Sequence, residues 1–598
     1  MPKPIRYMSK RRIYQMINDE INTSSRTKRI CNHQTNYLIP TEENNSAETV
    51  NSISVVSTDT SYTGENGGHN VAEQNEDHQD EVDAGNIDLP IVDNRTEGLH
   101  ELECVQFYRE DVSTTANSLS EDLRFWLSEN SISQKAASNL ISIFRNHGHQ
   151  DELKKDVRTL MKTPRDVTGK IIHGNGGSYF HFGISNGLIR SLNKYYDVNP
   201  DVILIQLNCD GMSFSKSSNS QFWPLLAAIE ADFYTEPFLI GLFHGFSKPN
   251  DFNVYINPFV DEMKDLQNNG IMINNKTIDV RLNAIICDAP ARAYLTLTKS
   301  HSGYFGCSKC IQEGEWDGYV NFPEINNPLR TDESFRNQQQ EDYHLGESLL
   351  LDLDFDMVSQ IPLDYQHLIC LGVTKRLLLR WCNGPKNQRL SKDKLNAINE
   401  TLQAIKVCIP TEFARQPRLL DTVAKWKATE CRQFLLYTGP IILKTIMGPR
   451  KYNHFMALSV AIRGLCDTQK YLVYSDYADQ LLRWFVEEYR KLYGSSSISY
   501  NVHNLIHLAS DCKKFGPLDN FSTFKFENYM STIKNKVKNA PKPLEQVVNR
   551  THEENSLPVI KNIVRPNLEV EEKNDKIIAL KFNGFTNHVT LKIYVFTL

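Results

Sequence analysis

Two pairs of potential metal ligands stand far apart in this chain. A fold that brought them together would have to place the start and the end of the long intervening segment side by side. Cys307 and Cys310 form a CxxC turn in HSGYFGCSKCIQEGEW, and His503 and His507 stand one helical turn apart in NVHNLIHL. Two thiolates and two imidazoles make up the tetrahedral shell of a structural zinc ion. Together the four residues predict a Cys₂His₂ zinc site that fastens two distant segments to each other.

Each pair by itself has a second interpretation. A CxxC turn is also the motif of thiol redox chemistry, and two histidines at this spacing on a Leu- and Ile-rich stripe are also found as buried core residues. The twelve cysteines stand at irregular positions, and the first thirty residues lack the apolar stretch of a secretory signal peptide. A reducing compartment follows, in which metal binding or redox work is favoured over a structural disulfide.

Two apolar, β-rich runs each end in an aspartate. DVILIQLNCDG carries Asp210 near its end, and KTIDVRLNAIICD ends at Asp288 before a segment with a helical pattern. Strands that alternate with helices indicate an α/β layer, and such sheets build their sites at the carboxyl ends of adjacent strands. Two carboxylates there would bind Mg²⁺ through hard oxygen ligands. An aspartate before glycine is also common as a plain turn residue, and that interpretation stays open.

A third carboxylate, Glu527, begins an amphipathic stretch near the end of the sequence. Ser531, Lys534 and Lys538 follow at the spacing of one helix face, so this face would present an acid and two cations toward phosphate. The predicted zinc site would bring Glu527 back to the sheet that bears Asp288. Three carboxylates holding two metal ions catalyse in-line attack on phosphodiesters. A lone glutamate on a lysine-rich helix is also the usual solvated salt-bridge partner.

The remaining chain divides by composition. Its first residues are basic, which suits a solvated end, a nuclear-import signal or a phosphate-contacting arm. The next stretch is acidic and too poor in apolar residues to fold, and it explains the net charge of −6. We predict a basic N-terminal segment (1–31), a disordered acidic linker (32–110) and a small helical region (117–165). The first part of an α/β core (195–310) follows, then a helical insertion (311–500), the final part of the core (501–550) and a C-terminal tail (551–598).

Five blocks of the sequence, in their order, resemble the transposases of CACTA-type DNA transposons and their relatives. The blocks are LNCDGMSFSKSSNSQFWPLLAAI, ICDAPARAYL, GYFGCSKC, LDYQHLICLGVTKRLL and NVHNLIHLASDCKKFGPLDNFSTFKFENYM. The resemblance covers about residues 120–550. It implies an α/β RNase H-like catalytic core of the DDE type, interrupted by a large all-α insertion. The Cys/His arrangement is also similar to that of the Transib-like transposases and the V(D)J recombinase.

The resemblance implies roles for individual residues. Asp210, Asp288 and Glu527 match three catalytic acids that hold Mg²⁺ or Mn²⁺, and the two cysteines and two histidines match ligands of structural Zn²⁺. Asp364 and His367, in LDYQHL, match a D-x-x-H motif. Either His367 contacts the scissile strand or orients a catalytic carboxylate, or Asp364 caps the following helix with His367 packed beneath it. Six basic residues are candidate phosphate contacts, with solvated surface positions as the alternative: Lys216, Arg292, Lys299, Lys534, Lys536 and Lys538.

The implied function is that of a nuclear DNA transposase that cleaves and joins double-stranded DNA at transposon ends and target, as a homo-oligomer and away from membranes. A second hypothesis is a domesticated, catalytically inactive derivative that binds DNA or chromatin. A third is a zinc-stapled helical scaffold for protein partners, which predicts no convergence of the three carboxylates. The pI near 6.3 does not point to a nucleic-acid binder, but an acidic segment can mask a basic face.

Overall fold

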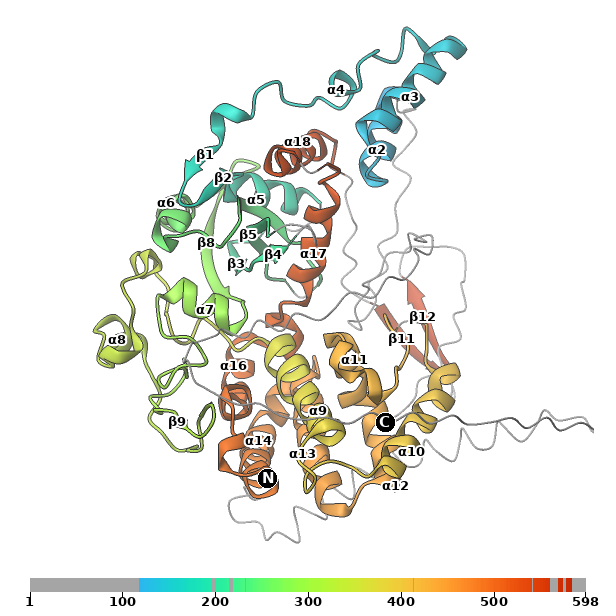
Figure 1. Ribbon diagram of the computed structural model, residues 1–598. Coiled ribbons are helices and arrows are strands. Elements are labelled where there is room, and N and C mark those ends of the chain that lie inside the picture. The colour runs from blue at the N-terminus through green and yellow to red at the C-terminus, as the bar shows by residue number, and fades with distance from the viewer. Residues whose placement is uncertain are drawn as a thin grey trace, which may run out of the picture. The chain divides into compact units, whose positions relative to one another are not determined.

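The computed structural model describes residues 118–194, 200–213, 219–231, 233–411, 413–539, 541–559, 568–573 and 577–582 (Figure 1). These residues form a mixed β-sheet accompanied by many helices. The predicted segments 1–31 and 32–110 lie outside the described residues, as do Lys216 and most of the predicted tail. No helix in the described ranges is both long and apolar enough to span a bilayer.

One sheet of eight strands organises the α/β part of the chain. Its strands are β1 (Ile172–Gly174), β2 (Gly177–His181), β3 (Val202–Cys209), β4 (Met212–Ser213), β5 (Gln221–Ile229), β6 (Phe238–Gly245), β7 (Ile271–Ile273) and β8 (Lys276–Ile285). The hydrogen-bonded order is β1-β2-β6-β5-β3-β8-β7, with β4 paired to β5 off this path. Neighbours are antiparallel except β3 and β8, which are parallel. The two strands that precede the predicted catalytic aspartates are therefore adjacent and point the same way.

Hydrophobic layers cover both faces of this sheet. On one face, Ile205 and Leu207 of β3 pack with helices α5 (Ile184–Asn193) and α6 (Phe252–Asn269). On the other, Phe222 of β5 belongs to the larger cluster that the helical block forms. A strand that is buried on both sides has a nearly continuous apolar sequence instead of alternating apolar and polar residues. This explains the mostly apolar sequence DVILIQLNC.

The helices beside the sheet begin and end at local signals. α6 begins after Asp251, whose carboxylate accepts hydrogen bonds from the first free N–H groups, and it ends at Gly270 with φ of 69°. α7 (Ala289–Thr296) begins after Asp288 with Pro290 in its first turn. One of the predicted metal ligands is thus also a helix cap.

Residues 311–500 are mostly, but not wholly, helical. The strands β9 (Glu315–Trp316) and β10 (Val320–Asn321) form a short antiparallel hairpin, so the expectation of an all-α insertion is wrong at this point. The α-helices are α8 (Asp332–Arg336), α9 (Lys375–Asn383), α10 (Lys392–Ile405), α11 (Ala428–Gln433), α12 (Gly439–Ile446), α13 (Pro449–Cys466) and α14 (Tyr471–Tyr493). Tighter or wider helical turns lie between them: η5 (Glu341–Tyr343), η6 (Leu349–Asp352), η7 (Gln366–Thr374), η8 (Lys406–Cys408), η9 (Leu420–Lys425), η10 (Phe434–Thr438) and η11 (Ser495–Ser497).

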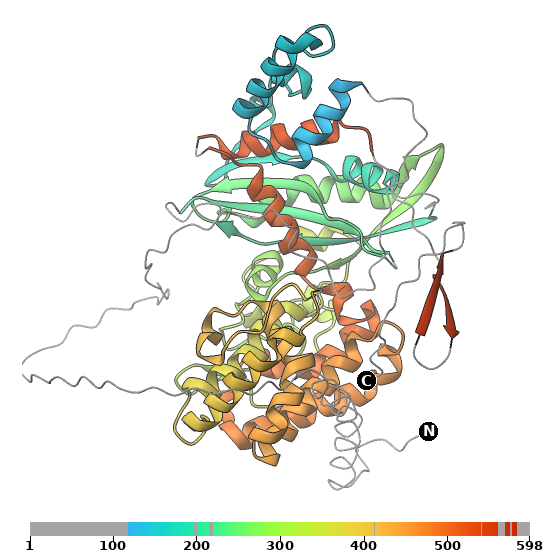
Figure 2. The same cartoon turned by 90° about the vertical axis from the view of Figure 1, so that its right-hand side faces the viewer.

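The chain then returns to the sheet. The elements are α15 (Tyr500–His503), η12 (Asn504–His507), α16 (Leu508–Phe515), η13 (Leu518–Phe521), α17 (Phe524–Asn535) and α18 (Pro543–Asn555). Figure 2 shows α17 crossing the strands. Lys525 of α17 donates to the Gln206 side chain of β3 at 2.6 Å, and Lys534 donates to the carbonyl of Ser213 at 3.3 Å. α17 ends at Asn535, so Lys538 lies beyond the helix and not on the face that the sequence pattern predicted.

Three helices that precede the sheet have a small core of their own. They are α2 (Leu119–Glu129), α3 (Gln134–Phe144) and α4 (Val157–Leu160), accompanied by the turns η3 (Arg145–His149) and η4 (Thr168–Lys170). Ser118, Ser133 and Asp156 cap the three helices through their side-chain oxygens. After α18, the strands β11 (Leu568–Lys573) and β12 (Ile577–Phe582) form a separate antiparallel pair.

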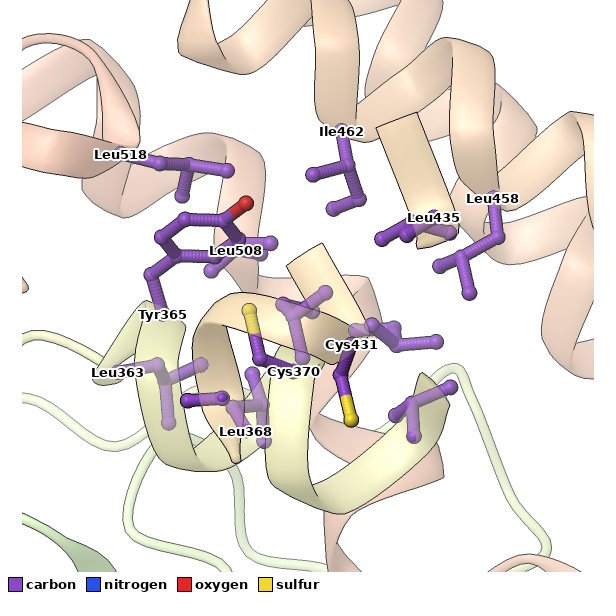
Figure 3. Close-up of a cluster of buried hydrophobic side chains, with 14 of the residues drawn as sticks. Leu363, Tyr365, Leu368, Cys370, Cys431, Leu435, Leu458, Ile462, Leu508 and Leu518 are labelled. Atoms are coloured by element: carbon purple, nitrogen blue, oxygen red, sulfur yellow. The ribbon is translucent and has the colours of Figure 1, made fainter. Parts of the chain in front are cut away.

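The segment around η7 is embedded in the core of the helical block. Figure 3 shows four side chains of this segment, Leu363, Tyr365, Leu368 and Cys370. They pack with side chains from other helices and turns: Cys431, Leu435, Leu458, Ile462, Leu508 and Leu518. Leu363 and Tyr365 are at most 1% exposed. Asp364, which stands between them, is therefore held on a backbone that cannot shift without disturbing the core.

Candidate functional site

The two predicted pairs of metal ligands come together in one buried cluster, which we name the Cys/His centre. The Cys307 and Cys310 sulfurs are 3.6 Å apart, Cys310 Sγ is 3.3 Å from His503 Nε2, and Cys307 Sγ is 3.8 Å from His507 Nε2. All four ligand atoms lie within 4.8 Å of one another. Tetrahedral zinc, with Zn–S of about 2.3 Å and Zn–N of about 2.0–2.1 Å, needs ligand separations of about 3.3–3.8 Å. The four residues could therefore hold a metal ion, as predicted.

The local backbone explains how the histidines meet the CxxC turn. His503 ends α15 and His507 ends the tight turn η12. The sequence pattern predicted one regular helical turn between the two histidines, but they lie on two successive helical elements instead. Their ring centroids are 5.4 Å apart. Asn504 is fully buried in this turn; its amide donates to the carbonyl of Tyr500, and its Oδ1 lies 3.7 Å from Cys307 Sγ. Asn504 is thus placed to accept a hydrogen bond from the Cys307 thiol in the metal-free protein.

Asp210 and Asp288 follow adjacent parallel strands. The strand pairing continues past the end of β8, where the N–H of Ile286 donates to the carbonyl of Leu207 at 2.8 Å. Asp210 accepts a hydrogen bond from the N–H of the next residue, Gly211, and Asp288 accepts from Ala291 at the start of α7, both at 2.7 Å. Asp288 therefore caps α7 and lies at the edge where α/β sheets build sites, and its role as a metal ligand stays a prediction.

Glu527, in the first turn of α17, contacts His367. His367 Nε2 is 3.3 Å from Glu527 Oε1, and His367 Nδ1 is 2.6 Å from Asp364 Oδ2. Asp364 also accepts hydrogen bonds from the backbone N–H of His367 and from the N–H and hydroxyl of Thr523, the residue before α17. Of the two interpretations of the D-x-x-H motif, the structure contains part of each: Asp364 receives N–H groups as a cap, and His367 contacts a carboxylate.

The charges of these groups act on one another. Burial and the neighbouring charge of Asp288 raise the pKa of Asp210 to about 7, and Glu527 adds to this effect. Burial opposes a charge on His367, but the hydrogen bond and charge of Asp364, with Glu527 and Asp288, outweigh it and raise the pKa of His367 to about 9. His367 is therefore cationic near neutral pH. We name Asp210, Asp288 and Glu527 the carboxylate group.

The carboxylate group has the chemistry of a divalent-cation site. Its ligands are hard oxygens, and no lysine or arginine of the described residues forms an ion pair with Asp210 or Asp288. Burial and the charge of Asp288, which raise the pKa of Asp210, would both be offset by a bound cation. Among the described residues, the Cys/His centre is the group whose potential ligand atoms lie within 4.8 Å of one another. The oxygens of the carboxylate group do not form such a group. Carboxylates of this kind would suit Mg²⁺ or Mn²⁺ rather than a soft metal, and such a site stays a prediction.

Two of the six candidate phosphate contacts are wrong. Arg292 is 5% exposed and donates to Ser308, Tyr500 and the carbonyl of Pro362, so its guanidinium is used inside the protein. Lys536 is also 5% exposed and forms an ion pair with Glu554. Periodicity could not separate these buried cations from surface ones. The remaining described candidates are exposed: Lys299, Lys534 and Lys538.

Two polar residues at the site were missed by sequence reasoning. Asn208 is 1% exposed, and its amide donates to the carbonyl of Ile286 at 2.8 Å, which joins the strand ends two residues before Asp210 and Asp288. Thr523 fastens the start of α17 to Asp364. A polar amide inside the apolar run VILIQLNC was the available signal for Asn208. Nothing local marked Thr523, because its partner lies far away in the sequence.

No protein-family model matches this chain, and no curated protein matches it either.

Proposed function

We propose that this protein is a DDE-type DNA transposase with an RNase H-like core, which cleaves and joins phosphodiester bonds of double-stranded DNA in the nucleus. The proposal is supported by the placement of Asp210 and Asp288 after the parallel neighbours β3 and β8, and by the charge of Glu527 from α17, which acts on Asp210. The antiparallel pairing of β3 with β5 supports it further, because an RNase H-like core opens with a strand hairpin.

In this proposal the carboxylate group holds two Mg²⁺ or Mn²⁺ ions, which supply an activated oxygen nucleophile and stabilise the leaving oxygen of an in-line displacement. His367 keeps its proton, orients Glu527 and offsets part of the negative charge that accumulates when a phosphate approaches. Lys534 is exposed, contacts the chain three residues after Asp210 and is suited to a DNA phosphate. The Cys/His centre holds a structural Zn²⁺.

The decisive experiment is a cleavage assay with the purified full-length chain on plasmid DNA, with Mg²⁺, with Mn²⁺ and with neither. We expect metal-dependent strand cleavage that Glu527→Gln lowers by at least about 10³-fold, since several kcal/mol of transition-state stabilisation are lost. The matched control is Glu400→Gln, an exposed helix glutamate in α10. DNA binding without cleavage by the wild type would favour the domesticated, inactive alternative, and absence of both would refute the proposal.

A further inference from the structure

The Cys/His centre and the carboxylate group are connected through buried polar contacts that neither site needs for its own ligands. Each contact starts on the CxxC turn or on the helix that follows Asp288, and each ends on residues 362–364. Polar groups that are buried this completely cost free energy unless they are paired. Their arrangement therefore identifies which parts of the molecule are held together.

The first contact passes through Arg292. Its backbone N–H donates to the carbonyl of Asp288, and its guanidinium donates to the hydroxyls of Ser308 and Tyr500 at 2.9 and 3.1 Å and to the carbonyl of Pro362 at 2.5 Å. Ser308 stands inside the CxxC turn, and Tyr500 begins the helix that bears His503. A single guanidinium thus joins both halves of the Cys/His centre to the segment before Asp364.

The second contact passes through a buried ion pair. Lys309, the other residue inside the CxxC turn, is 3.0 Å from Asp511 Oδ1 and donates to the carbonyl of Val358. The second oxygen of Asp511 accepts the N–H of Leu363 at 2.8 Å. Lys309 and Asp511 are 7% and 4% exposed, so the pair is held in a water-poor environment. Breaking one partner of such a pair is costly because a charge is left unpaired.

Both contacts end on the residues immediately before Asp364. Asp364 divides its two oxygens between the N–H of Thr523, at 2.8 Å, and the N–H and Nδ1 of His367, at 2.7 and 2.6 Å. Thr523 is the residue before α17, and His367 contacts Glu527. The route from the CxxC turn to the third carboxylate is therefore continuous in hydrogen bonds and covalent chain.

We infer that Arg292, Lys309, Asp511 and Asp364 are positioning residues that make the placement of Glu527 depend on an intact Cys/His centre. The segment 362–364 is the mechanical link: metal binding by the CxxC turn fixes Arg292 and Lys309, these fix the segment, and Asp364 then fixes His367 and the start of α17. The inference rests on the proposed function only for the role of Glu527. The link itself is a property of the folded chain.

The test measures hydrogen exchange by mass spectrometry in the full-length, zinc-loaded protein, in peptides that cover residues 362–368 and 521–528. Ser308→Ala with Tyr500→Phe removes only the hydroxyls that Arg292 contacts. Lys309→Met with Asp511→Leu replaces the ion pair by apolar groups of similar size and leaves no buried charge. The control is Arg450→Met with Glu488→Leu, a partly exposed ion pair between α13 and α14 that involves no residue of either site. Zinc content is measured for every variant.

We expect both link variants to keep one zinc ion per chain while exchange in peptide 521–528 becomes at least tenfold faster, and the control to exchange as the wild type does. Peptide 362–368 is compared only in the hydroxyl variant, because Asp511 is itself the acceptor of the Leu363 N–H. Removing zinc from the wild type should produce the same acceleration. Wild-type exchange in a zinc-loaded link variant overturns the inference. If the Lys309/Asp511 variant loses its zinc, the hydroxyl variant alone decides. DNA cleavage plays no part in this readout, so an inactive chain with the expected exchange pattern would refute the proposed function and leave the link standing.

Discussion

The Cys/His centre and the carboxylate group are both assembled from residues far apart in the chain, but they differ in how far the assembly has gone. The four Cys/His ligand atoms already lie within 4.8 Å of one another and are buried. The carboxylate group is more open at Glu527, whose side chain is 40% exposed, while burial and the charge of Asp288 raise the pKa of Asp210. A site that stabilises a fold can be closed, whereas a site that admits a substrate must keep exposed and mutually repelling charges.

The largest expected effect breaks the closed site. Cys310→Ser should abolish metal binding and remove a large part of the folding free energy, because structural zinc in small domains contributes about 10–16 kcal/mol. The measurements are metal content and thermal unfolding of the purified chain. Cys408→Ser, at an exposed cysteine outside the centre, is the control. Unchanged thermal stability in a metal-free Cys310→Ser protein would show that the centre does not hold the fold together.

The second prediction is that Asp210, when ionised in the carboxylate group without a metal ion, lowers the free energy of unfolding. Folded Asp210 keeps its proton up to about pH 7, whereas the ordinary value is 3.8. The folded state therefore binds more protons between these values, so the stability of the metal-free protein falls as pH rises through this window. A pKa that moves from 3.8 to about 7 corresponds to about 4 kcal/mol as an upper limit.

Asp210→Asn should accordingly raise the free energy of unfolding at pH 8 by about 2–4 kcal/mol in the absence of divalent metal, and flatten its pH dependence between pH 4 and 7. Urea unfolding at several pH values measures both. Asp393→Asn, on the exposed first turn of α10, is the control. A destabilised Asp210→Asn protein would mean that the carboxylate is satisfied as it stands and does not await a cation.

A smaller effect is expected from His367, which contacts both Asp364 and Glu527. His367→Gln removes the cation beside Glu527 but can keep a hydrogen bond to Asp364, so metal-dependent cleavage should fall about 10–100-fold with little loss of thermal stability. Rates at saturating Mn²⁺ measure the effect, and His552→Gln in α18 is the control. A variant that loses stability in proportion to its activity would assign His367 to the core rather than to the site.

The smallest effect distinguishes two lysines that stand two positions apart, Lys534 and Lys536. Lys534→Ala should weaken DNA binding severalfold and lower the slope of log affinity against log salt by about 1, because one phosphate contact is lost. Lys536→Met should leave that slope unchanged, since Lys536 is buried against Glu554, and instead reduce stability slightly. Fluorescence anisotropy with labelled duplex DNA at several salt concentrations measures both. Equal slopes for the two variants would contradict the assignment of Lys534.

The comparison also separates the features that local sequence signals could predict from those that they could not. The CxxC turn, the histidine pair and the apolar runs that end at Asp210 and Asp288 were visible because each depends on neighbouring residues. The tight turn between the histidines and the end of α17 at Asn535 were not, because periodicity does not set a helix end. The β9–β10 hairpin was also missed, since two-residue strands carry no readable alternation.

The sequence by itself determined which chemical groups this protein can use: two thiols and two imidazoles for one metal centre, hard carboxylates at strand ends, and a histidine near an aspartate. Only the tertiary structure decided which of them meet. Arg292 and Lys534 are equally basic in the sequence, yet one binds Pro362 and two hydroxyls inside the protein and the other remains exposed. The reason is physical: a side chain's charge is a local property, whereas its burial and its partners depend on segments that packing brings together from hundreds of residues away.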